Sequence, residues 1–200
     1  MDYGFFAFVS RMKNIDRWAL MRNSSHENVQ EHSHMVAVIA HALALIRRDV
    51  FMQPADPDRA AAAALFHDAT EIFTGDMPTP VKYLNPEIMK AYKDVESLAA
   101  ERLLSTLPDE LRPAYAGLMT ECGAETAALV KAADKISAYI KCVEELKAGN
   151  GEFSLAAKQT LEKIRAMHMP EADYFMEHFV PAFELTLDEL NYSIDDREEI

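Results

Sequence analysis

The sequence FHDATEIFTGDMPTP, residues 66–80, sets His67 and Asp68 side by side at the end of an alanine-rich, apolar stretch. Glu71 and Asp76 follow within the same segment. Burying this many titratable groups costs free energy unless something compensates their charges. A bound cation is one candidate for that role, so this segment is a candidate metal site.

Length and composition predict an all-α protein. The 200 residues suffice for one domain with a hydrophobic core of its own. Ala, Leu, Met, Glu and Lys are abundant, whereas Gly occurs only 6 times and the 9 prolines fall between the apolar-periodic segments. We expect a single compact multi-helix domain over residues 1–200, with a metal-site core at about 28–145 and C-terminal helices at 153–192.

The formal net charge of −13 argues against a protein that binds nucleic acid polymers. Phosphate backbones are held by clustered Lys and Arg, which this chain lacks. An anionic membrane surface is disfavoured for the same reason. A small anionic substrate remains compatible with this charge, because a bound divalent ion is usually the largest charge in its site.

The cysteines and the first residues indicate where the protein works. Cys122 and Cys142 have no zinc-ligand spacing, and free cysteines of this kind fit a reducing cytoplasm. The first residues lack a basic segment ahead of an apolar one, and the longest apolar run, near 35–46, is interrupted by His41 and too short to span a bilayer. We expect a cytoplasmic protein without an export signal or membrane anchor.

The segment VQEHSHMVAVIAHALALIRRDV, residues 29–50, has apolar residues at the 3.6-residue period of a helix that faces a core. His32 falls on this apolar stripe. His34 and His41 each lie about 200° around the helix from a member of the stripe. The pattern therefore predicts that only His32 of these three histidines faces the core.

Capping signals and breaks divide the rest of the chain into helices. Asp56 and Pro57 can start a helix that we expect to continue as far as Gly75. An Asn-Pro pair at 85–86 gives the same start signal for a long charged helix to about residue 106. The other expected helices lie at 5–14, 108–120, 125–148 and 153–167 and in the aromatic-rich tail.

On the helix that starts at Asp56, Glu71 lies four residues after His67 and three after Asp68, so its carboxylate projects over the same face. An imidazole and a carboxylate together suit divalent first-row metals, and His32 can supply a third ligand from another helix. The HExxH spacing of zinc peptidases is absent, so that chemistry is not indicated. From spacing alone, the alternative remains that these histidines are satisfied residues of the core.

Several motifs occur in one order along the chain. They are EHS (31–33), HDATE (67–71), GDMPTPVKY (75–83) and VKAADKISAYIKCVEEL (130–146), with IDRWALMRN (15–23) at the front and DYFMEHFVPAFELTLDE (173–189) at the back. In these motifs the chain resembles the HD-domain phosphohydrolases. More closely, it resembles the bacterial 5'-deoxynucleotidases, which remove phosphate from deoxynucleoside 5'-monophosphates. The resemblance covers nearly the whole chain.

The resemblance implies an HD-type fold with one divalent metal ion per chain, and the ligand chemistry suits Mn, Fe, Co, Ni or Zn. The implied metal ligands are His32, His67, Asp68 and Asp134. The residues implied to bind substrate are Arg17, Trp18, His32, Asp68, Asp76, Met77, Pro78, Thr79 and Asp134. Periodicity alone predicts otherwise for Asp134, which lies beside the apolar stripe of its helix and would by default be solvated or salt-bridged. Asp16, where relatives commonly carry Asn, is a conservative departure.

The remaining residues have assigned roles. Glu71 is not needed as a ligand, so we assign it to proton handling. Asp76 lies beside the implied pocket and can help to protonate the leaving 5'-oxygen. Which of the two carboxylates is the acid and which the base stays open.

Arg17 and Trp18 give the implied pocket a cationic and an apolar group. Arg17 offers a planar fork for phosphate oxygens and Trp18 an apolar wall for the sugar or base. The alternative roles are a salt bridge and a core tryptophan. A wall packed against the 2' carbon would reject a ribose hydroxyl, so we expect a preference for deoxynucleotides.

The expected activity is metal-dependent hydrolysis of deoxyribonucleoside 5'-monophosphates to deoxynucleosides and phosphate, with a metal-activated water as the nucleophile. One alternative is an HD-type phosphohydrolase that acts on a triphosphate, cyclic or signalling nucleotide. Another is a non-enzymatic helical module stabilised by the metal. The resemblance also suggests a homodimer, in which the aromatic tail at 174–183 is either a contact surface or part of the core.

Overall fold

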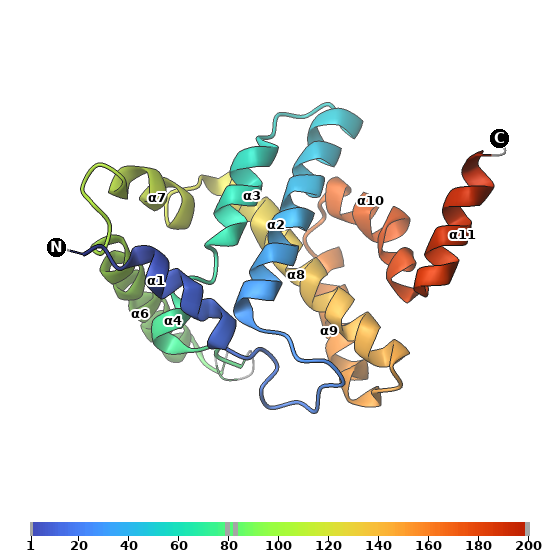
Figure 1. The fold of residues 1–200 in the computed structure, drawn as a ribbon, viewed down its shortest axis with the longest axis horizontal. Helices are drawn as coiled ribbons and strands as arrows, with labels where there is room; N and C mark the ends of the chain where they lie inside the picture. Colours follow the sequence, from blue (N-terminus) through green and yellow to red (C-terminus); the bar gives the residue numbers. More distant parts are fainter. Residues whose placement is uncertain (1, 79–80, 82–83, 199–200) are drawn as a thin grey trace.

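Every regular element in the described part of the chain is helical, as Figure 1 shows. The computed structural model describes residues 2–78, 81 and 84–198, and for 193–198 the backbone alone. The α-helices are α1 (Phe5–Val9), α2 (Val29–Leu45), α3 (Pro57–Leu65), α4 (Glu71–Thr74), α6 (Pro86–Leu104), α7 (Arg112–Met119), α8 (Ala124–Lys147), α9 (Ser154–Arg165), α10 (Pro170–His178) and α11 (Leu187–Glu198). Short 3-10 helices cover Ser10–Asn14, Gly151–Phe153 and Val180–Glu184, and a π-helical segment covers Ile46–Val50. The predicted all-α class is confirmed.

Helices α2, α3 and α8 pack together at the centre of the molecule (Figure 1). The face that α3 presents to the core is made of small side chains, Ala60, Ala63 and Ala64, which let the helix backbones approach closely. The buried members of the predicted α8 stripe are Leu129, Ala133, Ile136, Ile140 and Val143. Removing these stripes from water stabilises the three-helix centre. The helices that carry most of the candidate site are thereby held against one another.

The histidines of α2 lie as their spacing predicts. His32 is fully buried, His34 is exposed and His41 is half-buried. The start of the helix is fixed by a capping box, in which the Asn28 side chain accepts a hydrogen bond from the backbone N–H of Glu31 and the Glu31 carboxylate accepts one from the backbone N–H of Asn28. This cap sets the first turn of α2 and therefore the direction in which His32 points.

The predicted helix from Asp56 to Gly75 is wrong in its second half. It starts as expected, because the Asp56 carboxylate accepts a backbone hydrogen bond in the first turn and Pro57 is the first helical residue. However, α3 ends at Leu65, residues 66–70 form turns, and α4 has only 4 residues.

Local hydrogen bonds account for this break. Nδ1 of His67 donates to the carbonyl oxygen of Ala64 at 2.7 Å, so a side chain takes an acceptor that a continuing helix would use. The backbone N–H groups of Ala69 and Glu71 then bond to carbonyls three residues earlier, at 3.1 and 3.0 Å. His67 and Asp68 therefore lie in a turn between two helices and not on one continuous helix.

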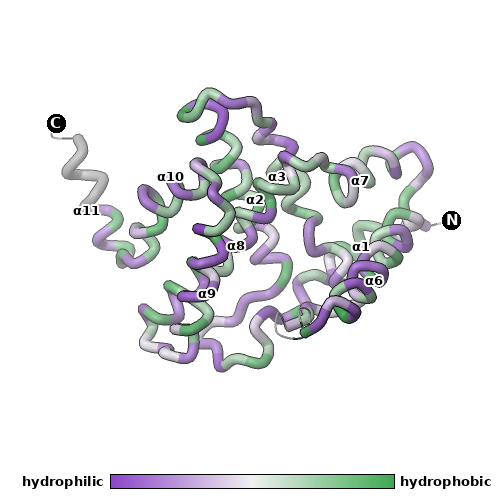
Figure 2. The backbone as a smooth tube through the Cα atoms, turned by 180° about the vertical axis from the view of Figure 1, so that it is seen from behind, coloured by the Kyte–Doolittle hydropathy of each residue, from purple (hydrophilic) through white to green (hydrophobic). Residues whose placement is uncertain are grey.

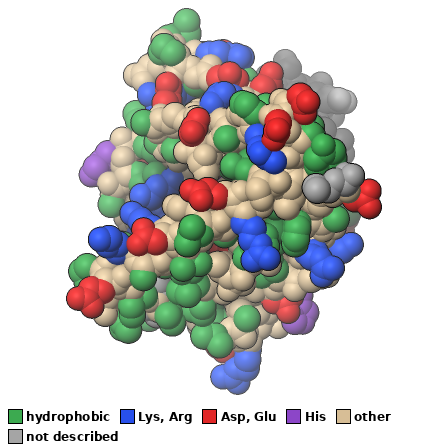
Figure 3. Space-filling view, turned by 90° about the vertical axis from the view of Figure 1, so that its left-hand side faces the viewer, with side chains coloured by type: hydrophobic (Ala, Val, Ile, Leu, Met, Phe, Trp, Pro, Cys, Tyr) green, Lys and Arg blue, Asp and Glu red, His purple; other side chains and the backbone are tan. Residues whose placement is uncertain are grey.

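A second apolar cluster joins α1, α6 and α7 at the other end of the molecule. Phe5 is fully buried there, and its ring centroid lies 4.8 Å from that of Tyr115. Hydrophobic and hydrophilic residues alternate along the helices (Figure 2), as expected when one face of each helix lies on a core. On the face that this end presents, Lys and Arg side chains are interspersed with Asp and Glu among hydrophobic ones (Figure 3).

No helix in the described ranges combines the length and the apolarity needed to cross a membrane. Both cysteines are free thiols, with Cys122 partly buried and Cys142 fully buried. Burial raises the pKa of the Cys142 thiol to about 12, so this group is an unreactive part of the core.

The connector between α1 and α2, residues 15–28, runs to the end of α8 (Figure 1). Glu145, which is fully buried on α8, holds it by accepting hydrogen bonds from the backbone N–H groups of Ser24 and Ser25. Lys141, one turn earlier on α8, pairs with Glu145 at 2.5 Å and donates to the carbonyl oxygen of Ser25 at 2.6 Å. A buried ion pair with satisfied hydrogen bonds thus anchors the connector.

Replacing Glu145 by Gln should lower the free energy of unfolding by about 3–5 kcal/mol at neutral pH, because the Lys141 charge is left buried without its partner. Burial raises the pKa of Glu145, but hydrogen bonds from Lys141 and Ser24 outweigh it and lower the pKa. The contribution of the carboxylate is therefore present above the ordinary value of 4.5 and is lost as the pH falls below it.

Chemical denaturation of both proteins at several pH values checks this expectation. The difference in unfolding free energy between wild type and Glu145→Gln should shrink as the pH falls below about 4.5. A difference that stays constant with pH would show that the charge of Glu145 does not stabilise the fold.

Candidate functional site

Three basic groups converge on one carboxylate oxygen, Oδ2 of Asp68. Nε2 of His67 lies 3.1 Å from it, Nη1 of Arg17 lies 3.6 Å away, and Nε2 of His32 lies 3.8 Å away. The packing of α2 on α3 brings these groups together from the connector, from α2 and from the turn after α3. Burial raises the pKa of Asp68, but the charge and hydrogen bond of His67 and the charges of His32 and Arg17 outweigh it, so the pKa lies well below its ordinary value. Asp68 is therefore a partly buried anion at the centre of the cluster.

Helix α8 contributes two side chains on the other side of His32. Nε2 of His32 lies 3.1 Å from Oδ1 of Asp134, and Nδ1 of His32 lies 3.2 Å from the hydroxyl oxygen of Ser137. Asp134 and Ser137 are three residues apart on α8 and so share a face. Burial raises the pKa of Asp134, but the hydrogen bond and charge of His32 outweigh it and lower the pKa. Asp134 thus lies against His32, at a position for which periodicity alone predicts a solvated or salt-bridged residue.

The imidazole of His67 is oriented by the protein backbone. Because the Ala64 carbonyl can only accept, Nδ1 of His67 carries the proton of the bond between them. This leaves Nε2 directed at the cluster, buried and without a hydrogen-bond partner among the described residues. Burial lowers the pKa of His67, but the negative charges of Asp68 and Asp134 outweigh it and raise the pKa to about 9. The site therefore attracts positive charge to this position.

The donor atoms of His32, His67 and Asp68 lie within 4.8 Å of one another. Two imidazoles with a carboxylate are a ligand set that suits a divalent first-row metal. A metal would also satisfy Nε2 of His67, whose lack of a partner otherwise needs an explanation. Asp134 adjoins this group through its contact with His32. The residues present therefore fit a bound divalent ion.

Glu71 and Asp76 add two more carboxylates beside Asp68. Glu71 is buried, and its Oε2 has no hydrogen-bond partner among the described residues. Burial together with the negative charges of Asp68 and Asp76 raises the pKa of Glu71 to about 9. Asp76 is partly buried just after α4. Glu71 is therefore a buried carboxyl whose surroundings disfavour its charged form.

Arg17 and Trp18 lie at the edge of the cluster and share one partner, Glu27. Oε2 of Glu27 accepts a hydrogen bond from Nε of Arg17 at 3.1 Å and one from Nε1 of Trp18 at 3.1 Å. The other end of the Arg17 guanidinium faces Asp68. The Trp18 ring packs on Phe153, with 5.4 Å between the ring centroids. Arg17 is thus salt-bridged inside the site, and Trp18 joins the site to the packed interior.

A family model described as 5'-deoxynucleotidase YfbR-like matches residues 4–183. The chain belongs to this 5'-deoxynucleotidase family. The resemblance read from the sequence is thereby confirmed, together with the enzyme class that it implies. The 5'-deoxynucleotidase of Erwinia tasmaniensis is 54% identical over 191 residues, which cover 94% of this chain and 96% of that protein. The 5'-deoxynucleotidase of Vibrio cholerae is 49% identical over 189 residues, which cover 94% of this chain and 97% of that protein.

Two solved HD phosphohydrolases have a fold similar to that of this chain. An HD-domain phosphohydrolase from Listeria innocua matches with a TM-score of 0.78 and 25% identity, over 90% of this chain and 87% of that one. The cyanophage S-2L HD phosphohydrolase, solved with dA and one catalytic Zn²⁺ ion, matches with a TM-score of 0.62 and 21% identity, over 88% of this chain and 95% of that one.

Most of the residues expected to act in this member of the 5'-deoxynucleotidase family are close together. His32, His67, Asp68, Asp134 and Arg17 form the contacts described above. Trp18, Glu71 and Asp76 border them, Met77 and Pro78 follow Asp76 and are partly buried, and Thr79 lies outside the described residues.

Two side chains that contact site residues, Ser137 and Glu27, could not be predicted from the sequence pattern. Ser137 follows Asp134 by three residues on α8, so it could have been found only once Asp134 was placed in the site. Glu27 lies in the connector, where no periodicity relates it to Arg17 or Trp18.

Proposed function

We propose that the cluster is the active site of a 5'-deoxynucleotidase that hydrolyses deoxyribonucleoside 5'-monophosphates to deoxynucleosides and phosphate. The observation that carries the proposal is the convergence of His32, His67 and Arg17 on Asp68, because it combines a metal-ligand set with a cation suited to phosphate. Relatives named 5'-deoxynucleotidase, which match nearly the whole chain, support the same substrate class.

His32, His67, Asp68 and Asp134 are proposed to hold one divalent ion of the Mn, Fe, Co, Ni or Zn class. When bound, such an ion lowers the pKa of a water nucleophile and polarises the phosphate. Ala64 and Ser137 support this ligand set, since each contacts Nδ1 of a histidine and leaves Nε2 directed at the site. The one catalytic Zn²⁺ ion of the cyanophage HD phosphohydrolase is consistent with this proposal.

Arg17 and Trp18 are proposed to bind the phosphate and the sugar. The guanidinium of Arg17 lies beside Asp68 and can donate to phosphate oxygens as a planar fork. The indole of Trp18 donates a hydrogen bond to Glu27 and packs against Phe153, so it can serve as a fixed apolar wall. Asp76, Met77, Pro78 and Thr79 complete the proposed pocket.

Glu71 is proposed to transfer the proton that hydrolysis requires. Burial and the neighbouring carboxylates raise its pKa, and its Oε2 has no hydrogen-bond partner among the described residues, so this atom is available to take up and pass a proton. Asp76 is proposed as the second carboxylate, beside the leaving 5'-oxygen. One of the two carboxylates is proposed to protonate the leaving group and the other to deprotonate the attacking water, with the order left open.

The enzyme should hydrolyse dAMP at least about 10-fold faster than AMP, because a ribose hydroxyl against the Trp18 wall is left without a partner. Base selectivity should be weak, since the proposed contacts are to phosphate and sugar. Phosphate release from matched deoxy- and ribonucleoside monophosphates measures both ratios. Equal turnover of dAMP and AMP would contradict the proposed role of Trp18.

We further propose that the protein is a cytoplasmic homodimer. Phe175 and Val180, from the aromatic tail, are buried in the core, whereas Phe179 is 46% exposed. Beyond it, α11 projects from the body of the molecule (Figure 1), with Leu187 and Tyr192 more than two-thirds exposed. These apolar side chains are the proposed contact surface. Light scattering should give twice the mass of one chain, and a monomer at micromolar concentration would contradict this.

A further inference from the structure

A single oxygen atom, Oε2 of Glu27, binds both of the side chains proposed to contact substrate. It accepts from Nε of Arg17 and from Nε1 of Trp18, each at 3.1 Å. The side chain of Glu27 is only 15% exposed, and that of Arg17 only 11%. Two groups that approach different parts of a nucleotide are therefore fixed to one point of the protein.

The backbone holds Glu27 directly opposite Arg17. The N–H of Arg17 donates to the carbonyl oxygen of Glu27 at 2.9 Å, and an antiparallel bridge joins Asp16 to Asn28. Asn28 is also the N-cap of α2. Glu27 is consequently braced at the start of the helix that carries His32, and its carboxylate holds Arg17, which in turn faces Asp68.

Trp18 adopts a backbone conformation that needs such support. Its φ is 57°, in the left-handed region, which bulky residues rarely occupy and which costs about 1–3 kcal/mol unless surrounding contacts enforce it. Its carbonyl accepts from the backbone N–H of Met21 at 2.8 Å and from the side chain of Asn23 at 3.2 Å. These bonds fix the backbone, whereas Glu27 fixes the indole itself.

We infer that Glu27 is a positioning residue, which sets the Arg17 guanidinium for the substrate phosphate and the Trp18 ring for the sugar. This inference rests on the proposed function. Among the described residues, Glu27 makes no hydrogen bond or ion pair with a proposed metal ligand, so it acts through Arg17 and Trp18. Its carboxylate also places a negative charge 3.1 Å from Nε of the Arg17 guanidinium.

Removing Glu27 should misplace both groups. Arg17 would retain Asp68 as an anionic partner and be drawn toward it, away from the position that faces the phosphate. The indole N–H of Trp18 would lose its acceptor, so the ring could rotate on Phe153. Misplacement of about 1 Å at a reacting group is enough to lower a rate about 100-fold.

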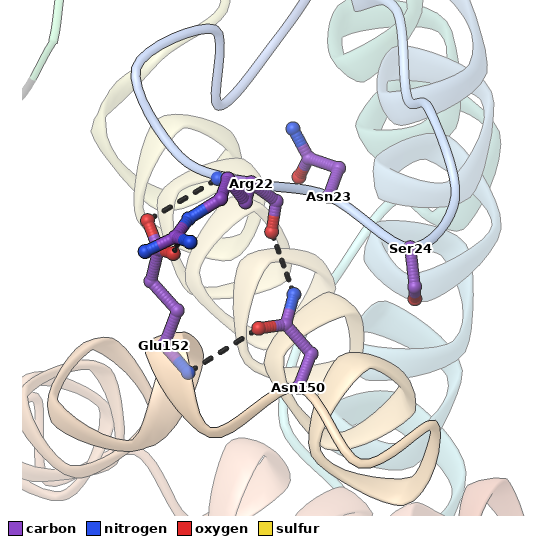
Figure 4. Close-up of a pocket in the computed structure, with 5 residues that line it drawn as sticks. All are labelled: Arg22, Asn23, Ser24, Asn150 and Glu152. Atoms are coloured by element: carbon purple, nitrogen blue, oxygen red, sulfur yellow. Dashed lines mark hydrogen bonds and ion pairs between the residues drawn. The ribbon is translucent and has the colours of Figure 1, made fainter.

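The experiment compares Glu27→Ala with the loss of a carboxylate that holds the same connector from outside it, Glu152 of the 3-10 helix Gly151–Phe153. Glu152 accepts hydrogen bonds from the backbone N–H and the side chain of Arg22, beside a pocket of about 610 Å³ (Figure 4). It contacts neither Arg17 nor Trp18 in the described contacts. Glu152→Ala is therefore a matched control for general loosening of the connector.

Fluorescence reports on the indole without any substrate, because Trp18 is the only tryptophan. Glu27→Ala should shift the emission to longer wavelength and increase quenching by acrylamide. Glu152→Ala should leave both close to wild type. Glu27→Gln keeps an acceptor oxygen for the indole, so it should retain wild-type emission. It removes only the negative charge that faces Arg17.

Kinetics on the metal-loaded enzyme then separates the two roles. Glu27→Ala should lower kcat/KM for dAMP about 100-fold and lower the ratio of dAMP to AMP turnover, because both Arg17 and Trp18 are released. Glu27→Gln should lower kcat/KM while keeping the deoxy-to-ribo ratio. Glu152→Ala should keep both quantities within about two-fold of wild type.

Each outcome decides the inference. Unchanged kcat/KM and unchanged deoxy preference in Glu27→Ala would overturn it, and so would equal losses in Glu152→Ala. If Glu27→Ala does not fold, an unchanged kcat/KM in Glu27→Gln overturns it. If wild type releases no phosphate from dAMP, the proposed function fails instead. Unchanged fluorescence in Glu27→Ala would then still show that Glu27 does not position the Trp18 ring.

Discussion

Replacing Glu71 by Gln is expected to lower phosphate release from dAMP by about 10²–10⁴-fold while the bound metal remains. Glu71 is buried beside Asp68, and Gln preserves its shape while removing the proton that the carboxyl carries. Because Gln is neutral, it also introduces no new charge into the site. Steady-state kinetics and metal content, measured on the same preparation, check both parts of the expectation.

Glu121→Gln is a suitable control, since Glu121 is an exposed carboxylate outside the cluster. It should change neither activity nor metal content. Wild-type activity in metal-loaded Glu71→Gln would contradict the proton-transfer role. Loss of the metal along with the activity would instead make Glu71 part of the metal site.

Replacing His67 by Ala is expected to weaken metal binding by at least about 100-fold, since loss of a supporting residue alone commonly costs 10–100-fold. Nε2 of His67 is buried and has no hydrogen-bond partner among the described residues, so the variant loses the proposed ligand and its 3.1 Å ion-pair contact with Asp68. Phosphate release should fall in parallel with metal content. Titration of the metal-free protein with Mn²⁺ or Co²⁺ measures the change in affinity.

His34→Ala provides the matched control. His34 is an exposed histidine on α2, two residues from His32, so its loss removes an imidazole of the same helix from outside the cluster. Metal affinity should stay at the wild-type value. Equal weakening in His34→Ala and His67→Ala would contradict the ligand set, and so would unchanged affinity in His67→Ala.

A purely structural metal site is a poor account of this cluster. Glu71 and Asp76 stand beside Asp68, and burial together with the negative charges of Asp68 and Asp76 raises the pKa of Glu71. A structural ion gains nothing from extra carboxylates that are not ligands and that raise the cost of burial. A catalytic site, by contrast, needs a group that can hold and release a proton.

Periodicity succeeded where residues face the core. The stripe of α2 placed His32 inside and His34 outside, because burial of an apolar face is a local property of the helix. The caps at Asp56 and Asn85 also begin helices as predicted, since each side chain bonds to a backbone N–H within its own first turn.

Periodicity failed where a single side chain competes with the backbone. The alanine-rich sequence favours a helix through residues 66–70. In the structure these residues form turns instead, in which Nδ1 of His67 donates to the Ala64 carbonyl. The position of Asp134 depends on how α8 packs on α2, which no local pattern contains. The whole-chain resemblance supplied that residue.

Glu27 illustrates a further limit. Its role depends on the pairing of residues 16 and 28 across the connector, and on the unusual φ of Trp18. An isolated pairing of two residues has no periodic sequence pattern. A positive φ at a tryptophan is uncommon, so the residue type does not predict it. Contacts of this kind are found only in the folded structure.

Phosphate release from dAMP by the purified protein, with and without a divalent ion, tests the central claim most directly. The account predicts release of inorganic phosphate with at least one of Mn²⁺, Fe²⁺, Co²⁺, Ni²⁺ and Zn²⁺, loss of release on chelation, and recovery when the ion is restored. No phosphate from dAMP with any of these ions, or full activity after complete removal of metal, would contradict it.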